Sequence, residues 1–165
     1  RVLSTFLTWM NEKTSPVFVV ATANDHASIP PEFLRAGRFD EIFFVDLPNL
    51  DERKEIFEVH LRKKKLDIKN FDPTNLATAS NGYSGAEIEK SIENAMLIGF
   101  DDDRRKIGTI DVLNALKGFK PLSVMREGEF DELRDWAKNR CVKASLDSTS
   151  TPLYNNNSKQ NRLGF

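Results

Sequence analysis

The sequence has one cysteine, almost no net charge and no long apolar run, and each shortage excludes a class of protein. Cys141 alone cannot form a disulfide framework or a multi-cysteine metal site. The net charge of −1 over 165 residues argues against a general nucleic-acid or membrane surface, which normally carries a basic excess. No apolar run reaches the roughly 18 to 20 residues of a membrane span, and no signal-peptide pattern is visible. We therefore expect a soluble protein of a reducing compartment.

What is present is a globular composition, with 39% hydrophobic and 30% charged residues. The length suits one medium domain or two small ones. Phe6, Leu7 and Met10 continue an apolar helical spacing that begins at Val2 and Leu3. Because the sequence opens inside an amphipathic helix, we expect it to be a fragment of a longer protein.

Two apolar runs predict buried strands. Residues 17–21 are continuously apolar, as is typical of a central strand covered on both faces. The stretch "EIFFVDL", residues 41–47, predicts a second buried strand. Between them, "IPPEFLRAG" predicts a short helix with Pro31 in its first turn and Gly37 near its end. Strand, helix and strand together indicate the end of a doubly wound α/β sheet, in which ligands sit at the carboxyl ends of strands.

After Pro48 the pattern predicts helices alone. Asn49 with Glu52 and Ser84 with Glu87 are capping boxes, and Asp72 and Thr109 are candidate N-caps. The run "RKKK" at residues 62–65 is interpreted as a solvated helix end, where cations suit the helix dipole. Residues 127–140 predict a last amphipathic helix. The polar, aperiodic tail at 146–165 predicts disorder.

The motifs "VFVVATAND", "FLRAGRFDEIFFVDLP" and "GYSGAEIEK" resemble the C-terminal half of an AAA ATPase module, in family order and at family spacing. The resemblance covers roughly residues 1 to 120. It points to the clade of FtsH proteases, proteasomal ATPases and NSF-like proteins. The phrases "FLTWMNEKTSPVFVVATAN" and "MREGEFDELRDWAKNRC" are most similar to the uncharacterised AAA family encoded by plastid and cyanobacterial genomes.

The resemblance implies an α/β fold: the C-terminal part of a P-loop NTPase-type parallel sheet, then an AAA helical lid bundle, an extra C-terminal helix and a disordered tail. The implied domains are residues 1–47 for the end of the α/β nucleotide-binding subdomain, 48–120 for the lid, 121–145 for the C-terminal helix and 146–165 for the tail.

Three residues near the predicted sheet carry implied catalytic roles. Asn24 matches sensor 1, an amide that positions a γ-phosphate and the attacking water. Taken alone it would read as an ordinary strand end. Arg35 and Arg38 match the arginine fingers, which act on the nucleotide of the next subunit, although an exposed surface pair is the plain alternative. The family usually has Thr where Ala23 stands and Pro where Ala36 stands.

Three lid residues carry implied nucleotide-binding roles. His60 matches a lid histidine near adenine and ribose, although a lone histidine on an apolar helix face is more often a packed residue. Gly85 and Ala86 open the "SGAE" helix, where small residues permit close approach to base or sugar. An ordinary capped helix explains the same residues. Lid motifs with this sequence lack a sensor-2 arginine, so none is assigned.

The sequence holds no G-x-x-x-x-G-K-[ST] motif and no strand ending in paired acids. The cofactor implied by the resemblance is ATP, with Mg²⁺ held by a missing N-terminal half. The implied partners are identical AAA subunits in a ring, expected to be a hexamer, and an unknown protein substrate, with no nucleic acid and no membrane. The implied location is the cyanobacterial cytoplasm or the chloroplast stroma.

Two functions remain open. In the first, the chain is part of an ATPase that remodels proteins. In the second, it is a non-catalytic helical interaction module whose half-sheet only supports the bundle. A P-loop in the coding sequence upstream of residue 1 would separate them. An FtsH-type protease would need H-E-x-x-H after the lid, which the sequence does not contain.

We expect residues 1–165 alone to show no useful ATP binding or hydrolysis, because phosphate-cradling amides, a P-loop lysine and a magnesium ligand are not encoded in them. Equilibrium dialysis measures this directly. Micromolar ATP binding by the isolated chain would overturn the expectation.

Overall fold

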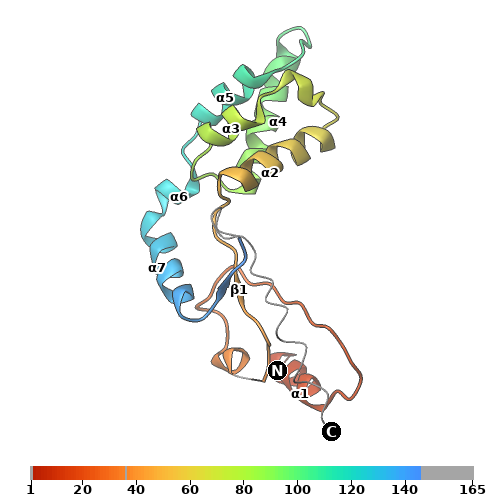
Figure 1. Cartoon of the computed structure of the whole chain (residues 1–165), viewed down its shortest axis with the longest axis vertical. Helices are drawn as coiled ribbons and strands as arrows, with labels where there is room; N and C mark the ends of the chain where they lie inside the picture. Colours follow the sequence, from red (N-terminus) through yellow and green to blue (C-terminus); the bar gives the residue numbers. More distant parts are fainter. Residues whose placement is uncertain (1, 36, 146–165) are drawn as a thin grey trace, which may run out of the picture. The chain divides into compact units, whose positions relative to one another are not determined.

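The computed structural model describes residues 2–35 and 37–145, which divide into two compact units (Figure 1). The mixed unit comprises residues up to 44 together with 128–142, and the helical unit comprises residues 45–127. Ala36 and the tail at 146–165, for which the sequence predicts disorder, lie outside the described residues, as do the side chains of Val2 and Leu3.

The mixed unit contains two helices, one 3-10 turn and a small sheet. The elements are α1 (Val2–Glu12), η1 (Pro31–Leu34), β1 (Phe43–Phe44), α7 (Glu127–Lys138) and β2 (Val142–Lys143). The first residue of α7 and the last residue of β2 already belong to the helical unit. The predicted N-terminal helix, the short helix after Pro30 and the last amphipathic helix are confirmed, the short one as a 3-10 turn.

The predicted buried strand at residues 17–21 is wrong in this structure. The segment is extended chain without a sheet partner, and Phe18 is 93% exposed. The second predicted strand shrinks to β1, which pairs with β2, and Val142 N donates to Ile42 O at 2.8 Å. A strand is stable only when a neighbour takes up its backbone hydrogen bonds, and no described segment lies in place to do so for residues 17–21. A small sheet and helices are thus present, whereas the larger parallel sheet remains a prediction.

The helical unit contains all the remaining elements. They are α2 (Leu50–Lys63), η2 (Ile68–Asn70), α3 (Pro73–Ala79), α4 (Gly85–Asp101), α5 (Thr109–Lys117) and α6 (Leu122–Met125). Helix α2 packs against α3 and α4, and α5 packs against α3 and α4. No described helix is both long and apolar enough to cross a membrane.

The predicted N-caps of α2, α3 and α4 are confirmed. Asn49 Oδ1 accepts from Glu52 N at 3.0 Å while Glu52 returns a bond to Asn49 N at 2.8 Å. Asp72 caps α3, and Ser84 caps α4 in a second capping box. These bonds satisfy backbone N–H groups that a helix leaves open at its start.

The predicted cap at Thr109 is wrong by one residue. Gly108 occupies the N-cap position of α5, and the Asp111 carboxylate accepts from Gly108 N at 2.8 Å. The hydroxyl of Thr109 instead accepts from Asp72 N at 2.8 Å, which joins the starts of α3 and α5. A tertiary contact has therefore taken the hydroxyl that local sequence assigned to capping.

The core of the helical unit is shared by α2, α3, α4 and α5. Phe57 and Leu61 of α2 and Ile88 and Ile92 of α4 are fully buried. Arg53 is also buried, and its guanidinium donates to the carbonyls of Ala77 at 2.9 Å and Pro48 at 2.7 Å. This arginine ties the beginning of α2 to the end of α3 and to the segment that enters the unit.

We predict that Gly99→Ala destabilises the helical unit by roughly 1–3 kcal/mol, because an added Cβ would clash with Ile107 Cγ2 and lie 3.2 Å from Arg105 O. Urea unfolding followed by circular dichroism measures the change.

Gly85→Ala, on the same helix, is the matched control. Its added Cβ meets Ile56 Cδ1 at an ordinary 3.8 Å, so the unfolding free energy should change by no more than about 0.5 kcal/mol. Equal effects of the two substitutions would contradict the close packing at Gly99.

Candidate functional site

The two arginines of "FLRAGRFD" lie on either side of the turn at Gly37, between two aromatic residues. Gly37 has φ +85, a left-handed conformation that glycine adopts without strain. The rings of Phe33 and Phe39 flank the turn with their centroids 6.1 Å apart. Arg35 is exposed and Arg38 is half-buried, and neither forms an ion pair with a described acidic residue. The turn therefore presents two permanent cations on a supported backbone.

The aromatic support continues onto α1. Phe33 stacks on Phe6 with a centroid distance of 6.1 Å, and Phe6 stacks on Trp9 at 5.6 Å. Aromatic pairs in this range contribute about 0.5–1.5 kcal/mol beyond area burial. The N-terminal helix thus positions the arginine turn within the mixed unit.

Asn24 lies on an exposed bend at the start of a hydrogen-bonded turn. Asp25 Oδ1 accepts from Ala27 N at 3.0 Å, and the hydroxyl of Ser28 donates to Asp25 Oδ2. The Ser28 hydroxyl, and after it the Ala27 amide, hold the pKa of Asp25 below its ordinary value. His26 packs on Trp136 of α7 with ring centroids 5.0 Å apart. The loop is ordered by these contacts, but no hydrogen bond joins Asn24 to either arginine among the described residues.

His60, Gly85 and Ala86 belong to the helical unit, where α2 and α4 pack together. A Cβ at Gly85 would lie 3.8 Å from Ile56 Cδ1, so α4 begins beside the turn of α2 that precedes His60. The same distance shows that this position would accept alanine, so packing alone does not require glycine there. Ala86 is exposed. The structure thus places Gly85 beside α2 and His60 beside α4, whereas Ala86 is exposed in the first turn of α4.

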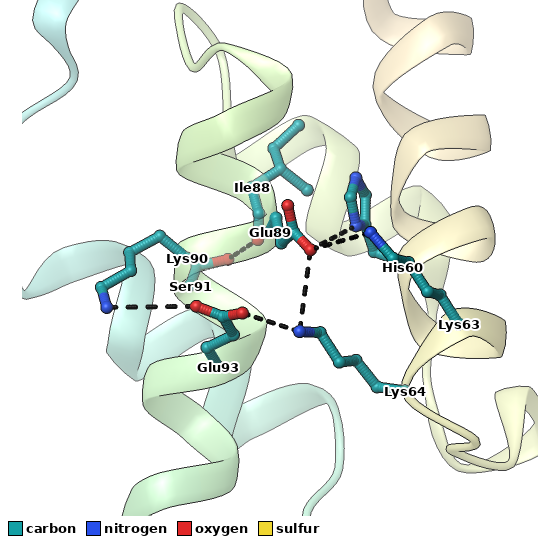
Figure 2. A network of polar contacts seen from close by, with 8 residues as sticks. All are labelled: His60, Lys63, Lys64, Ile88, Glu89, Lys90, Ser91 and Glu93. Carbon is teal, nitrogen blue, oxygen red and sulfur yellow. Dashed lines mark hydrogen bonds and ion pairs between the residues drawn. The ribbon is translucent and has the colours of Figure 1, made fainter.

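The imidazole of His60 faces Glu89 across the two helices (Figure 2). His60 Nδ1 lies 3.4 Å from Glu89 Oε1, within ion-pair range, and the two side chains are 16% and 30% exposed. Nδ1 is nonetheless buried without a hydrogen bond, because the approach fails hydrogen-bond geometry. A buried polar atom without a hydrogen bond is uncommon, and it marks His60 as the most unusual polar group of the site.

Two lysines of the "RKKK" run join this pair to a network (Figure 2). Glu89 Oε1 lies 3.4 Å from Lys63 Nζ and 3.6 Å from Lys64 Nζ, and Lys64 Nζ bonds Glu93 Oε1 at 2.7 Å. Burial opposes ionisation of Glu89, but Lys63, His60 and Lys64 outweigh it and lower its pKa. The interpretation of the whole run as a solvated helix end is therefore wrong for Lys64, which is half-buried and paired with α4.

The start of α4 already faces a carboxylate. Glu87 Oε2 accepts from Ser84 N at 2.8 Å and from Ser84 Oγ at 2.7 Å, while Oε1 accepts from Leu122 N at 2.7 Å. Burial raises the pKa of Glu87, but the bonds from Ser84 and Leu122 outweigh it and the pKa is lowered. The positive end of the α4 dipole is thus partly compensated within the chain.

Sequence reasoning missed Glu89 and Glu93 as partners of the candidate site. Their i, i+4 spacing places both on one face of α4, and a run of cations on another helix is a signal for such a face. Only the tertiary packing shows that these glutamates face the lysines at the end of α2. The described residues contain no cluster of His, Cys, Asp or Glu suited to a metal ion.

We predict that Glu93→Gln destabilises the helical unit near neutral pH and loses its effect in acid. The Lys64 ammonium lowers the pKa of Glu93 from its ordinary 4.5, so the contribution is fully present above pH 4.5 and is lost as pH falls through the folded-state value. Glu93 raises the pKa of Lys64 above 10.5, so the pair is also lost at high alkaline pH.

Urea midpoints measured from about pH 3 to about pH 7 test this sign. Glu55→Gln, at an exposed position of α2, is the control and should show no pH-dependent difference from the original sequence. A Glu93→Gln effect of equal size at both ends of the range would contradict the ion-pair account.

Comparison with known proteins finds a family model that matches part of this chain and several relatives. Residues 1–47 match the model of the "ATPase family associated with various cellular activities (AAA)". The chain is 52% identical over 138 residues to "Uncharacterized AAA domain-containing protein ycf46" of Guillardia theta, which covers 83% of this chain and 27% of that protein. It is 40% identical over 102 residues to "ATP-dependent zinc metalloprotease FtsH" of Parabacteroides distasonis. That match covers 62% of this chain and 15% of that protein.

A third relative is "Proteasome-activating nucleotidase" of Sulfurisphaera tokodaii, 36% identical over 104 residues that cover 63% of this chain and 26% of that protein. The chain spans about a quarter of the length of the ycf46 proteins that it matches. The resemblance indicated by the motifs is confirmed: the chain is related to the AAA ATPases and is similar to the ycf46 group among them.

Proposed function

We propose that this chain is the C-terminal part of an AAA module and contributes to ATP binding and hydrolysis that drive protein remodelling. The observation that carries the proposal is the arginine turn, in which Arg35 and Arg38 flank Gly37 between the stacked rings of Phe33 and Phe39. The match of residues 1–47 to the AAA family supports it.

The proposed role of the arginines follows from their chemistry. A guanidinium is permanently charged, and its planar fork matches phosphate oxygens. A cation that approaches the γ-phosphate of a neighbouring subunit would neutralise charge that develops during phosphoryl transfer. The lack of an ion-pair partner for either arginine among the described acidic residues leaves both side chains available for that contact.

Asn24 is the proposed sensor 1. A neutral amide can donate to a phosphate oxygen and accept from the attacking water, which positions the nucleophile without forming a covalent bond. Its place at the start of a turn held by Asp25, Ala27 and Ser28 gives the amide an ordered backbone.

His60, Gly85 and Ala86 are the proposed lid contacts to the base and sugar of ATP. The position of His60 supports this role, because it lies on the face of α2 that packs against the start of α4, beside Glu89. The residues described here would hold the adenosine end of the cofactor. Phosphate-cradling amides and the ligands of Mg²⁺ are proposed to come from the remainder of the module.

The proposed partners are identical subunits in a ring, with a hexamer as the expected state, and an unidentified protein substrate. A trans-acting arginine requires at least one neighbouring subunit, because the finger serves a nucleotide bound elsewhere. The proposed location, the cyanobacterial cytoplasm or the chloroplast stroma, rests on the similarity to the ycf46 group. The division into residues 1–47, 48–120 and 121–145 likewise stays a proposal.

A non-catalytic helical interaction module remains the second candidate, because the helical unit has its own buried core around Phe57, Leu61, Ile88 and Ile92. The coding sequence upstream of residue 1 decides between the two. A P-loop there favours the ATPase, and a coding sequence without one favours the interaction module.

We predict that Arg38→Ala in the full-length ring lowers ATP turnover by roughly 10³ to 10⁵, the range for loss of an arginine finger in other phosphoryl-transfer enzymes. Arg35→Ala should also lower turnover. Steady-state phosphate release from the assembled ring measures both.

Arg62→Ala is the matched control, because Arg62 is exposed and, among the described acidic residues, forms an ion pair with Glu58 alone, one helical turn away. Its turnover should equal that of the original protein. Unchanged turnover in Arg38→Ala rings, with assembly verified by sedimentation, would refute the finger assignment.

A further inference from the structure

A hollow of about 460 Å³ lies on the helical unit, between the segment that follows α2 and the end of α4. Its apolar lining comes from Leu66, Phe71, Met96, Phe100 and Ile107. Volumes of about 300–1,000 Å³ are typical of ligand-binding pockets. None of the proposed nucleotide contacts lines this hollow, so it requires an explanation of its own.

The rim of the hollow is basic. Lys65, Arg104 and Lys106 line it, are exposed, and form no ion pair with any acidic residue that the structure describes. Asp67, the acidic residue in the lining, uses a carboxylate oxygen to cap Lys69 N at 3.1 Å. The lining therefore combines an apolar floor with three cations that form no ion pair among the described residues and one carboxylate, Asp67.

A fourth cation, Arg105, has a structural role. Its guanidinium bonds Asp111 through two nitrogens at 3.0 and 2.7 Å, and its Nε bonds Asp102. These charge-assisted bonds anchor the α4–α5 loop to the start of α5. Figure 1 shows this loop at the end of the helical unit, beyond α4. Arg105 holds the loop, and the neighbouring Arg104 and Lys106 face the hollow.

Two of the three rim cations occupy left-handed backbone conformations. Lys65 has φ 59 and Arg104 has φ 58, and Asp103 beside it has φ 49. At Lys65 this conformation belongs to the end of α2, where Leu66 N donates to Leu61 O and Lys65 N donates to Arg62 O, both at 2.9 Å, as is common where a helix ends. Asparagine adopts the same conformation more readily than other residues with a Cβ, so Arg104→Asn can remove the charge without added backbone strain.

We propose that this hollow binds an acidic peptide segment of a partner protein. An apolar side chain of the peptide would lie on Met96 beside the Phe100 ring, over which the Arg104 guanidinium lies at 5.2 Å, and flanking carboxylates would meet Lys65, Arg104 and Lys106. Clusters of basic residues recognise acidic motifs in this way. Phe100 is 57% exposed at the site, which suits a segment that crosses the surface better than a small molecule buried over most of its area.

The proposal is independent of the ATPase function. In a remodelling ring the hollow would recruit a substrate or adaptor, and in a non-catalytic module it would be the interaction site itself. If the nucleotide assignments were wrong, the peptide proposal would still stand. If the peptide proposal were wrong, the nucleotide assignments would still stand.

The test uses the 165-residue chain and a fluorescein-labelled ten-residue peptide that alternates aspartate with leucine or phenylalanine. Fluorescence anisotropy should show saturable binding at low salt, and raising the salt from about 50 to about 300 mM should weaken it several-fold, since exposed charges are screened. A peptide with asparagine in place of aspartate, and one with alanine in place of the apolar residues, should both bind much less.

The double variant Arg104→Asn, Lys106→Gln removes two rim charges, and asparagine tolerates the left-handed backbone at 104. We expect binding to weaken about tenfold, which corresponds to 1.4 kcal/mol. Lys54→Gln, at an exposed position of α2 outside the hollow, is the control and should bind as the original chain does.

Equal binding by the double variant and the original chain would overturn the proposal. Equal binding of the aspartate and asparagine peptides would also overturn it, and this comparison needs no variant to fold. Self-association of the chain that competes with the peptide and is abolished by the double variant would show instead that a second copy occupies the hollow.

Discussion

The apolar core that α2, α3, α4 and α5 share is the constraint on which the helical unit depends, and α2 and α4 contribute four of its fully buried side chains. Phe57, Leu61, Ile88 and Ile92 are fully buried there, and side chains of this kind each contribute about 1.5–3 kcal/mol when fully buried. His60 precedes Leu61 and Glu89 follows Ile88, so the packing that buries the apolar residues also brings the polar pair together. The geometry of the candidate nucleotide site is therefore a consequence of the core.

The mixed unit has a different basis for its order. Its small sheet is held at β1 and β2, while stacked rings at Phe6, Phe33 and Phe39 support the arginine turn. Exposed apolar residues such as Phe18 remain on extended chain. The arginine turn is thus supported by local aromatic packing, and the sheet contributes little to it within the described residues.

Local chemistry explains which features could be predicted from the sequence. Capping at Asn49, Asp72 and Ser84 depends on atoms within three residues, so the helix starts were predicted correctly. Strand pairing depends on a distant partner, and the strand expected at residues 17–21 is absent from the structure for that reason. The family resemblance was readable from the arginine turn and the lid motif, because those residues are contiguous.

Contacts across the fold account for what could not be predicted. The hydroxyl of Thr109 bonds Asp72 N rather than its own helix, and Lys64 pairs with Glu93 on another helix. In both cases the partner lies on, or caps, a different helix, so the sequence around either residue does not identify it. The basic hollow could not be predicted for the same reason. Lys65 and Lys106 line it together because the segments that follow α2 and α4 lie side by side in the fold.

The central claim is that the facing turns of α2 and α4 close on a nucleotide. Hydrogen exchange on the full-length ring, with and without a non-hydrolysable ATP analogue and Mg²⁺, measures this most directly. Slower exchange at residues 56–64 and 84–90 in the nucleotide-bound ring, with α5 unchanged, is the predicted result. Identical exchange in both segments at saturating nucleotide would contradict the claim.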